Sequence, residues 1–183
     1  DRNHPSVVMY SLYNEEPLQD NENGRKLASR LNRVVKKLDD TRFTLGANNS
    51  GILNKDGAGD VCDIIGVNYQ SKEFDRFLEA FPNTPIVGSE NCSALMTRGC
   101  YKSDNDKNEL GMLDTETVGW GDTYIDGFNA IKTRPRFMGY FVWTGFDYRG
   151  EPTPFGYPSI STFFGIMDTC GFKKSAYFFV FRG

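Results

Sequence analysis

Histidine is nearly absent from this 183-residue sequence, in which only His4 is present and a proline follows it. Ser-His-Asp and Cys-His triads need a histidine as general base, so both are excluded unless His4 serves. The cysteines Cys62, Cys92, Cys100 and Cys170 have neither C-x-x-C nor paired Cys/His spacing, and a zinc site therefore lacks ligands. We expect free thiols, with a Cys92–Cys100 disulfide across a short loop as the alternative.

Long apolar runs and basic stretches are also missing. No segment approaches the roughly 18 apolar residues of a membrane span, and the first residues do not resemble a signal peptide. Lys and Arg total 21 against 24 Asp and Glu, a net charge of -3, and no basic run is interleaved with aromatic residues. We expect neither a nucleic acid partner nor a membrane span. The sequence does not fix the location, although a periplasmic or secreted protein is favoured over a cytoplasmic one.

Apolar residues recur at strand spacing in some segments and at helix spacing in others, and the two kinds of segment alternate along the chain. With 39% hydrophobic and 14% aromatic residues, the chain can bury the core of a globular domain. Strands are predicted at 6–12, 43–47, 62–68, 85–89 and 137–144, and helices at 23–38, 74–81, 117–132 and 173–181. Strand alternating with helix predicts an α/β protein with parallel strand pairing and right-handed crossovers.

The first predicted helix carries apolar residues at helical spacing among Arg and Lys. Its stripe consists of Leu27, Leu31, Val34, Val35 and Leu38. We expect this stripe to face the sheet. The start of the helix is expected to be capped by the asparagine at position 23.

Two strand-like segments end in a glutamate, Glu15 after residues 10–14 and Glu90 after residues 85–89. In parallel α/β proteins the carboxyl ends of the strands form the ligand-binding edge, so the two glutamates suggest a pair of catalytic carboxylates. Each could otherwise be a solvated acid that begins a loop, because exposed Glu is the rule. Glu16 is adjacent to Glu15, but consecutive strand residues point to opposite faces and only one of them can face a site.

Three blocks of sequence resemble one known family. Residues 1–15, DRNHPSVVMYSLYNE, look like the acid/base signature of glycoside hydrolase family 2, the β-galactosidase and β-glucuronidase family. Ser89-Glu90, followed by residues 93–101, resembles the nucleophile segment of that family. Residues 141–154 and 164–168 are similar to its last barrel strand and the loop that follows.

The resemblance implies a partial (β/α)8 TIM barrel that spans about strands four to eight, in agreement with the five strands counted from the pattern. Residues 1–183 are then expected to form a single partial barrel domain. The first barrel strands and the β-sandwich domains of relatives would be absent from it. The expected partners are a carbohydrate substrate, the remaining barrel half and sandwich domains of a parent chain, and a possible oligomer.

The resemblance also implies roles for individual residues. Glu15 would be the general acid and then base, and Glu90 the nucleophile, of a retaining exo-β-glycosidase. Asn14 would hydrogen-bond the sugar 2-hydroxyl, and Tyr69 would hydrogen-bond the nucleophile, with rim packing of Tyr69 as the alternative. Trp143 would either stack on a sugar ring or serve as core material. No organic cofactor is expected, and a divalent or sodium ion is possible in a parent enzyme.

The substrate is left open by the sequence. β-Galactosidase specificity is our leading expectation, with β-glucuronidase or β-mannosidase specificity, or a non-catalytic carbohydrate-binding or structural fragment, as alternatives. Tyr10 and Tyr13 stand where the family usually has Trp and Gly, and the larger Tyr13 would either crowd the sugar or contact it. Asp147 and Glu151, in the last loop, are expected to cap turns rather than to line the pocket.

Overall fold

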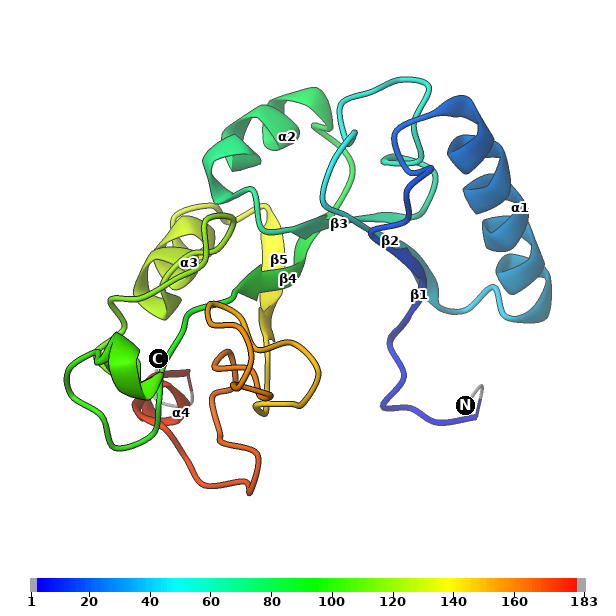
Figure 1. Cartoon of the computed structure of the whole chain (residues 1–183). Helices are drawn as coiled ribbons and strands as arrows, with labels where there is room; N and C mark the ends of the chain where they lie inside the picture. Colours follow the sequence, from blue (N-terminus) through cyan, green and yellow to red (C-terminus); the bar gives the residue numbers. More distant parts are fainter. Residues whose placement is uncertain (1–2, 181–183) are drawn as a thin grey trace. The chain divides into compact units, whose positions relative to one another are not determined.

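The computed structural model describes residues 3–180, which belong to two compact units (Figure 1). The first unit comprises residues 1–90 and 134–140, and the second comprises residues 91–133 and 141–183. The first two residues of the N-terminal motif and position 181 of the last predicted helix lie outside the described residues. The expectation of a single domain stays a prediction.

One five-stranded sheet has the strand order β1-β2-β3-β4-β5. The strands are β1 (Met9–Asn14), β2 (Phe43–Asn48), β3 (Ile64–Asn68), β4 (Ile86–Cys92) and β5 (Phe137–Trp143). The helices are α1 (Glu22–Leu38), α2 (Phe74–Ala80), α3 (Tyr124–Lys132) and α4 (Ser175–Val180), with short 3₁₀ turns η1 (Ser71–Glu73) and η2 (Asn105–Lys107). The neighbours from β1 to β4 pair in parallel, which confirms the predicted α/β class.

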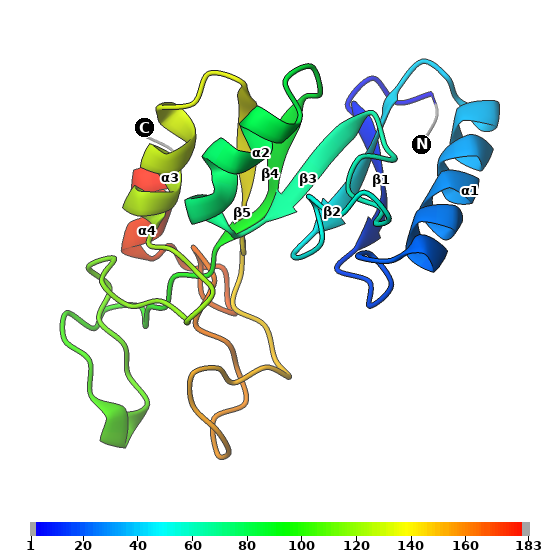
Figure 2. The ribbon, with the colours of Figure 1, turned by 90° about the horizontal axis from the view of Figure 1, so that it is seen from above.

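The first unit has a cluster of buried apolar side chains on one face of strands β1 to β4. Met9, Leu45, Ile64 and Val87, one from each strand, pack together on one face. The opposite face of β2 contacts α1, which lies along β1 and β2 in Figure 1, while Figure 2 shows β2 between β1 and β3. Because β1 to β4 are parallel, their carboxyl ends meet at one edge of the sheet, where a ligand site is expected.

The N-cap of α1 lies two residues before the predicted one. Asn21, and not Asn23, is the N-cap, and its Oδ1 accepts hydrogen bonds from the amides of Asn23 (3.0 Å) and Gly24 (3.2 Å). These bonds satisfy two of the amides that the first turn of a helix leaves unpaired. The helix therefore begins at Glu22, one residue earlier than predicted.

The expectation that the apolar stripe of α1 faces the sheet was wrong for four of its five residues. Leu27, Leu31, Val34 and Leu38 are 51%, 37%, 51% and 65% exposed. The buried residues of α1 are the small Gly24 and Ala28. Gly24 allows a close approach, because a Cβ there would lie 1.8 Å from the carbonyl oxygen of Leu18.

Helix α3 begins at Tyr124, seven residues later than the predicted start at 117. Gly119 and Gly121 lie in the segment that was expected to be helical, and the amide of Gly121 donates to the carbonyl of Val118 in a turn. Thr123 is the N-cap, with its hydroxyl accepting from the amide of Asp126 at 3.0 Å. Glycine costs a helix about 1 kcal/mol relative to alanine, which favours the turn over two further helical turns.

In the second unit, Leu95, Leu110, Val118 and Phe164 form a buried apolar cluster.

All four cysteines are free thiols, so the expectation of free thiols is confirmed and the alternative Cys92–Cys100 disulfide is wrong.

A buried ion pair in the second unit anchors the loop that follows β5. The Nζ of Lys174 lies 2.7 Å from Asp147 Oδ2 and donates to the carbonyl of Met96 at 2.7 Å. Asp147 also accepts from the amide of Gly165, and Glu151 accepts from the Tyr148 hydroxyl. Turn capping, the role expected of both acids, is not what these contacts show: Asp147 pairs with a buried lysine and Glu151 accepts from a tyrosine hydroxyl.

Candidate active site

Glu15 lies directly after β1, at the carboxyl edge of the sheet. The strand runs from Met9 to Asn14, later than the predicted 6–12, and its register with β2 shifts between Ser11 and Asn14. The Glu15 amide donates to the carbonyl of Ala47 at the end of β2 (3.0 Å), so the chain at Glu15 is still tied to the sheet. Glu15 is partly buried, while Glu16 is exposed, as expected for a residue that does not face the site.

Glu90 lies inside β4 rather than after it, because this strand extends to Cys92 and not to the predicted 89. The β3–β4 register shifts just before Asn68, which pairs with Glu90. The Tyr69 hydroxyl donates to Glu90 Oε1 at 2.8 Å, and the Tyr69 amide donates to the Glu90 carbonyl at 2.7 Å. The predicted contact between Tyr69 and the second carboxylate is therefore present.

Asn68, the last residue of β3, contacts the other carboxylate. Its Nδ2 donates to Glu15 Oε1 at 2.8 Å and to Asn14 Oδ1 at 3.0 Å. Its Oδ1 accepts from the Ser89 hydroxyl at 2.6 Å. Asn68 and Tyr69 are consecutive, so the end of one strand supports Glu15 through one side chain and Glu90 through the next.

The backbone at this edge adopts conformations that L-residues seldom take. Glu15 has φ 53° and Tyr69 has φ 59°, both in the left-handed region. Non-glycine residues there cost on the order of 1–3 kcal/mol each, and such strain concentrates at functional sites. Glu15 is one proposed catalytic residue, and Tyr69 contacts the second, Glu90. The strain at both positions is consistent with a functional site at this edge.

Tyr13 points away from this group of residues. Its hydroxyl lies 3.1 Å from both Asn48 Oδ1 and the carbonyl oxygen of Ala58, and its ring covers Gly46. Burial raises the pKa of Tyr13 well above its usual value. The expectation that Tyr13 crowds or contacts a sugar finds no support in these contacts. Tyr10 donates to Asp39 Oδ2 at 2.9 Å, next to the end of α1.

Trp143 belongs to the second unit. It packs against the buried cluster that contains Leu95 and Phe164, and its ring meets Tyr148 edge to face with centroids 5.8 Å apart. It is partly and not fully buried, so both expected roles are compatible with its packing. Stacking of Trp143 on a sugar stays a prediction.

The sequence prediction missed Asn68 and Ser89. Asn68 is fully buried, yet every polar atom of its side chain makes a hydrogen bond. A signal was present, because a polar residue that ends a nearly all-apolar strand must find partners at that strand end. The partners themselves could not be identified, since they come from β1 and β4.

No group of three or more His, Cys, Asp or Glu side chains arranged to hold a metal ion is found among residues 3–180. In the same part of the chain, no helix is long and apolar enough to span a membrane.

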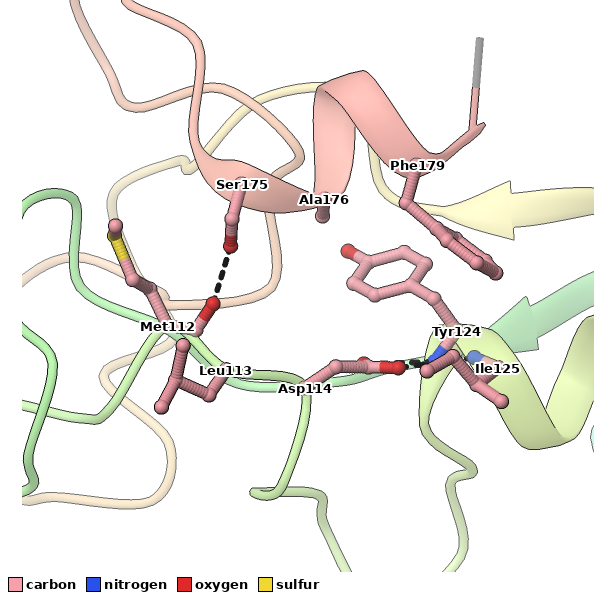
Figure 3. A pocket seen from close by; sticks show the side chains of 8 residues that line it. All are labelled: Met112, Leu113, Asp114, Tyr124, Ile125, Ser175, Ala176 and Phe179. Atoms are coloured by element: carbon pink, nitrogen blue, oxygen red, sulfur yellow. Dashed lines mark hydrogen bonds between the residues drawn. The ribbon is translucent and has the colours of Figure 1, made fainter. Parts of the chain in front are cut away.

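A cavity of about 200 Å³ lies within the second unit (Figure 3). Its walls are mostly apolar, with Leu113, Ile125 and Phe179 among the lining residues. The carboxylate of Asp114 accepts hydrogen bonds from the amides of Tyr124 and Ile125 at the start of α3, each at 2.9 Å. None of the predicted catalytic residues lines this cavity, and its one carboxylate already serves as a helix cap.

A family model matches most of the chain. Residues 1–166 match the model described as the TIM barrel domain of glycosyl hydrolases family 2. The β-galactosidase BoGH2A of Bacteroides ovatus is 32% identical over 97% of this chain, and the chain spans 27% of the length of that relative.

Solved structures share the fold. A β-galacturonidase of Eisenbergiella tayi superposes with a TM-score of 0.74 over 97% of this chain and 33% of its own, at 21% identity. A β-glucuronidase of an uncultured Clostridium superposes with a TM-score of 0.76 over 98% of this chain and 32% of its own, at 20% identity. At these identities the superpositions establish the fold, and they agree with the predicted partial barrel.

Proposed function

This chain belongs to glycosyl hydrolase family 2, of whose barrel domain it forms a part, and from this premise we propose that it carries the catalytic carboxylates of a retaining exo-β-glycosidase. Glu15 is the general acid and base, and Glu90 is the nucleophile. One observation supports this proposal most strongly. The consecutive residues Asn68 and Tyr69 contact Glu15 and Glu90 respectively, so the two carboxylates are held at one strand end.

The chemistry follows from these positions. Glu90 attacks the anomeric carbon as Glu15 protonates the leaving oxygen, and a covalent glycosyl-enzyme forms. Glu15 then removes a proton from the water that releases the sugar, so the configuration is retained. The Tyr69 hydroxyl holds Glu90 for attack, and Asn14 donates to the sugar 2-hydroxyl, an interaction that strengthens as charge develops at the anomeric carbon.

β-Galactoside is our proposed substrate, supported by the 32% identity to the β-galactosidase of Bacteroides ovatus. Glucuronide and mannoside specificity are the alternatives. A glucuronide carboxylate would need a nearby Arg or Lys, and turnover of the glucuronide in preference to the galactoside would favour that alternative.

The test is an assay with chromogenic β-galactoside, β-glucuronide and β-mannoside. Each substrate is offered to this chain alone and to a fusion in which the N-terminal barrel half of the Bacteroides ovatus relative precedes it. We expect turnover of the galactoside by the fusion, with the β-anomer as the first product in a proton NMR time course. A 2-deoxy-2-fluoro galactoside should add one sugar mass to Glu90.

Matched variants identify the roles of the two acids. Glu90→Gln and Glu15→Gln should each abolish hydrolysis, while Glu16→Gln, the same change at the exposed neighbour, should leave it intact. Labelling at another residue, or an inverted first product, would contradict the proposal. Inactivity of both proteins on every substrate would favour the non-catalytic alternative.

A further inference from the structure

Both polar atoms of the Asn68 side chain make hydrogen bonds. Its two amide hydrogens go to Asn14 and Glu15, and its oxygen accepts from Ser89. The residue is completely buried. A buried amide is costly unless each polar atom is paired, and here the pairing is complete.

The surroundings of Asn68 allow one orientation of its amide. Rotation by 180° would place its oxygen against Glu15 Oε1 and Asn14 Oδ1, which are both acceptors. The Ser89 hydroxyl donates to the oxygen in the observed orientation. Asn68 therefore presents fixed donors to its two neighbours from β1.

This fixed donor constrains the protonation of Glu15. Asn68 donates to Oε1, and a carbonyl oxygen accepts better than the hydroxyl oxygen of a neutral acid, so the proton of neutral Glu15 is favoured on Oε2. A general acid delivers its proton along one direction, so the choice of oxygen decides where a leaving group can receive it.

The same amide constrains Asn14. Asn68 donates to Asn14 Oδ1, so the Asn14 side chain must present its Nδ2 on the other side. Asn14 is exposed, and its Nδ2 makes no hydrogen bond to the described residues. A donor directed away from the sheet is what recognition of a sugar hydroxyl requires.

We propose that Asn68, whose oxygen is bound by the Ser89 hydroxyl, is a positioning residue that directs both the proton of Glu15 and the amide donor of Asn14 toward the substrate. This inference rests on the proposed function. It adds a residue that touches no substrate and acts through two residues that do.

The test compares Asn68→Asp with Asn48→Asp. Both replace a buried asparagine at the end of neighbouring strands, but Asn48 donates to the carbonyls of Gly46 and Gly66 and not to Glu15. The substrates are a phenyl glycoside, whose leaving group needs a proton, and a dinitrophenyl glycoside, whose leaving group does not. Both are assayed with the active fusion.

Asn68→Asp should lower kcat/KM for the phenyl glycoside by on the order of 100-fold, the scale of general acid catalysis, and for the dinitrophenyl glycoside by less than about 10-fold. Asn48→Asp should lower both by the same factor. Ser89→Ala should show the Asn68→Asp pattern in weaker form. Equal losses on both substrates in Asn68→Asp would reduce Asn68 to a structural role and overturn the inference.

The role toward Asn14 has its own readout. A 2-deoxy glycoside lacks the hydroxyl that Asn14 is proposed to bind. The ratio of kcat/KM for the normal glycoside to kcat/KM for the 2-deoxy glycoside should fall in Asn68→Asp and persist in Asn48→Asp. An unchanged preference would refute the second half of the proposal.

A measurement without turnover separates this inference from the proposed function. The Asn68 side-chain amide resonances, followed by ¹⁵N NMR against pH, should shift as Glu15 ionises and lose that shift in Glu15→Gln. If no substrate is hydrolysed but the coupling is seen, the proposed function fails while the contact that positions Glu15 holds. If Asn68 does not respond to Glu15, the inference fails whatever the activity.

Discussion

Tyr69 is the residue through which β3 supports the proposed nucleophile, and its phenol makes a contact that one substitution can remove. Tyr69→Phe deletes the hydrogen bond to Glu90 Oε1. A hydrogen bond to a charged group contributes about 1.5–3 kcal/mol. We expect kcat/KM to fall about 10- to 100-fold and by similar factors for phenyl and dinitrophenyl glycosides, because the loss affects the attack and not protonation.

Tyr10→Phe is the matched control for Tyr69→Phe. It removes the same hydroxyl from a tyrosine that donates to Asp39 rather than to a site carboxylate. It should change thermal stability but not the kinetic pattern. A Tyr69→Phe enzyme with wild-type kcat/KM would contradict the support proposed for Glu90.

At the residue scale, what the sequence could predict depended on where the partners come from. The placement of Glu15 and Tyr69 directly after strands, and of Glu90 near the carboxyl end of its strand, follows from local apolar patterns and from motif resemblance. Asn68 was missed because its partners lie 53 and 54 positions earlier and 21 positions later in the chain. The register shifts that bring these residues together depend on strand pairing, which local periodicity does not encode.

The elements themselves were predicted well where propensity and packing agree, and poorly where they disagree. The apolar spacing of α1 correctly indicated a helix, but it did not indicate which face is buried. The small Gly24 and Ala28 lie against the rest of the unit, while Leu27 and its neighbours on the stripe stay exposed. A helix can approach closely through its small residues, so the most apolar face was not the buried one.

The junction after α1 should make stability depend on pH. Asp39 is the C-cap residue, and hydrogen bonds from Thr41, Tyr10 and Arg42 hold its pKa well below the usual range. Its stabilising effect is therefore complete above the unfolded-state pKa of about 3.9 and is lost as the pH falls toward the folded-state value. Asp39→Asn should be less stable than wild type at pH 7.

Urea unfolding at pH 7, 5, 4 and 3 checks this expectation. The difference in free energy of unfolding between wild type and Asp39→Asn should shrink below about pH 4, because wild type then loses the advantage that the variant never had. A difference that stays constant down to pH 3 would show that Asp39 contributes nothing through its charge.

The loop after β5 depends on the buried pair of Lys174 and Asp147. Burial lowers the pKa of Lys174 and raises the pKa of Asp147, while their mutual attraction acts in the opposite direction on both groups. Lys174→Met leaves Asp147 as a buried unpaired charge and should cost about 3–5 kcal/mol of unfolding free energy. Guanidinium unfolding of the chain measures this loss.

The double variant Lys174→Met/Asp147→Asn is the control for that loss. The second substitution makes the side chain at position 147 neutral, and its amide oxygen can still accept from the backbone amide of Gly165. The double variant should therefore regain part of the stability lost by Lys174→Met alone. If the two substitutions are simply additive, the pair is not energetically coupled.

At the scale of the whole molecule, β1 and β5 are the first and last strands of the sheet that the described residues form. Such edges, together with an exposed apolar helix stripe, favour association. The chain expressed alone should therefore self-associate through the α1 stripe of Leu27, Leu31, Val34 and Leu38. Leu31→Lys should raise the monomer fraction in sedimentation velocity at micromolar concentration.

Tyr157→Lys is the comparison for that experiment. Tyr157 is also an exposed apolar residue, at 94% exposure, but it lies in the loop after β5. The Tyr157→Lys substitution should leave the monomer fraction unchanged. Equal effects of the two substitutions would point to general solubility and not to the stripe.

Finally, the ring of Tyr13 occupies the volume that a side chain at Gly46 would need, with its hydroxyl oxygen 2.3 Å from where a Cβ would lie. A larger residue at position 46 therefore requires a smaller residue at position 13, and substitutions at the two positions are expected to occur together. Homologues with glycine or alanine at the position of Tyr13 should therefore carry a bulkier residue at the position of Gly46. Such paired exchange would appear as covariation in an alignment.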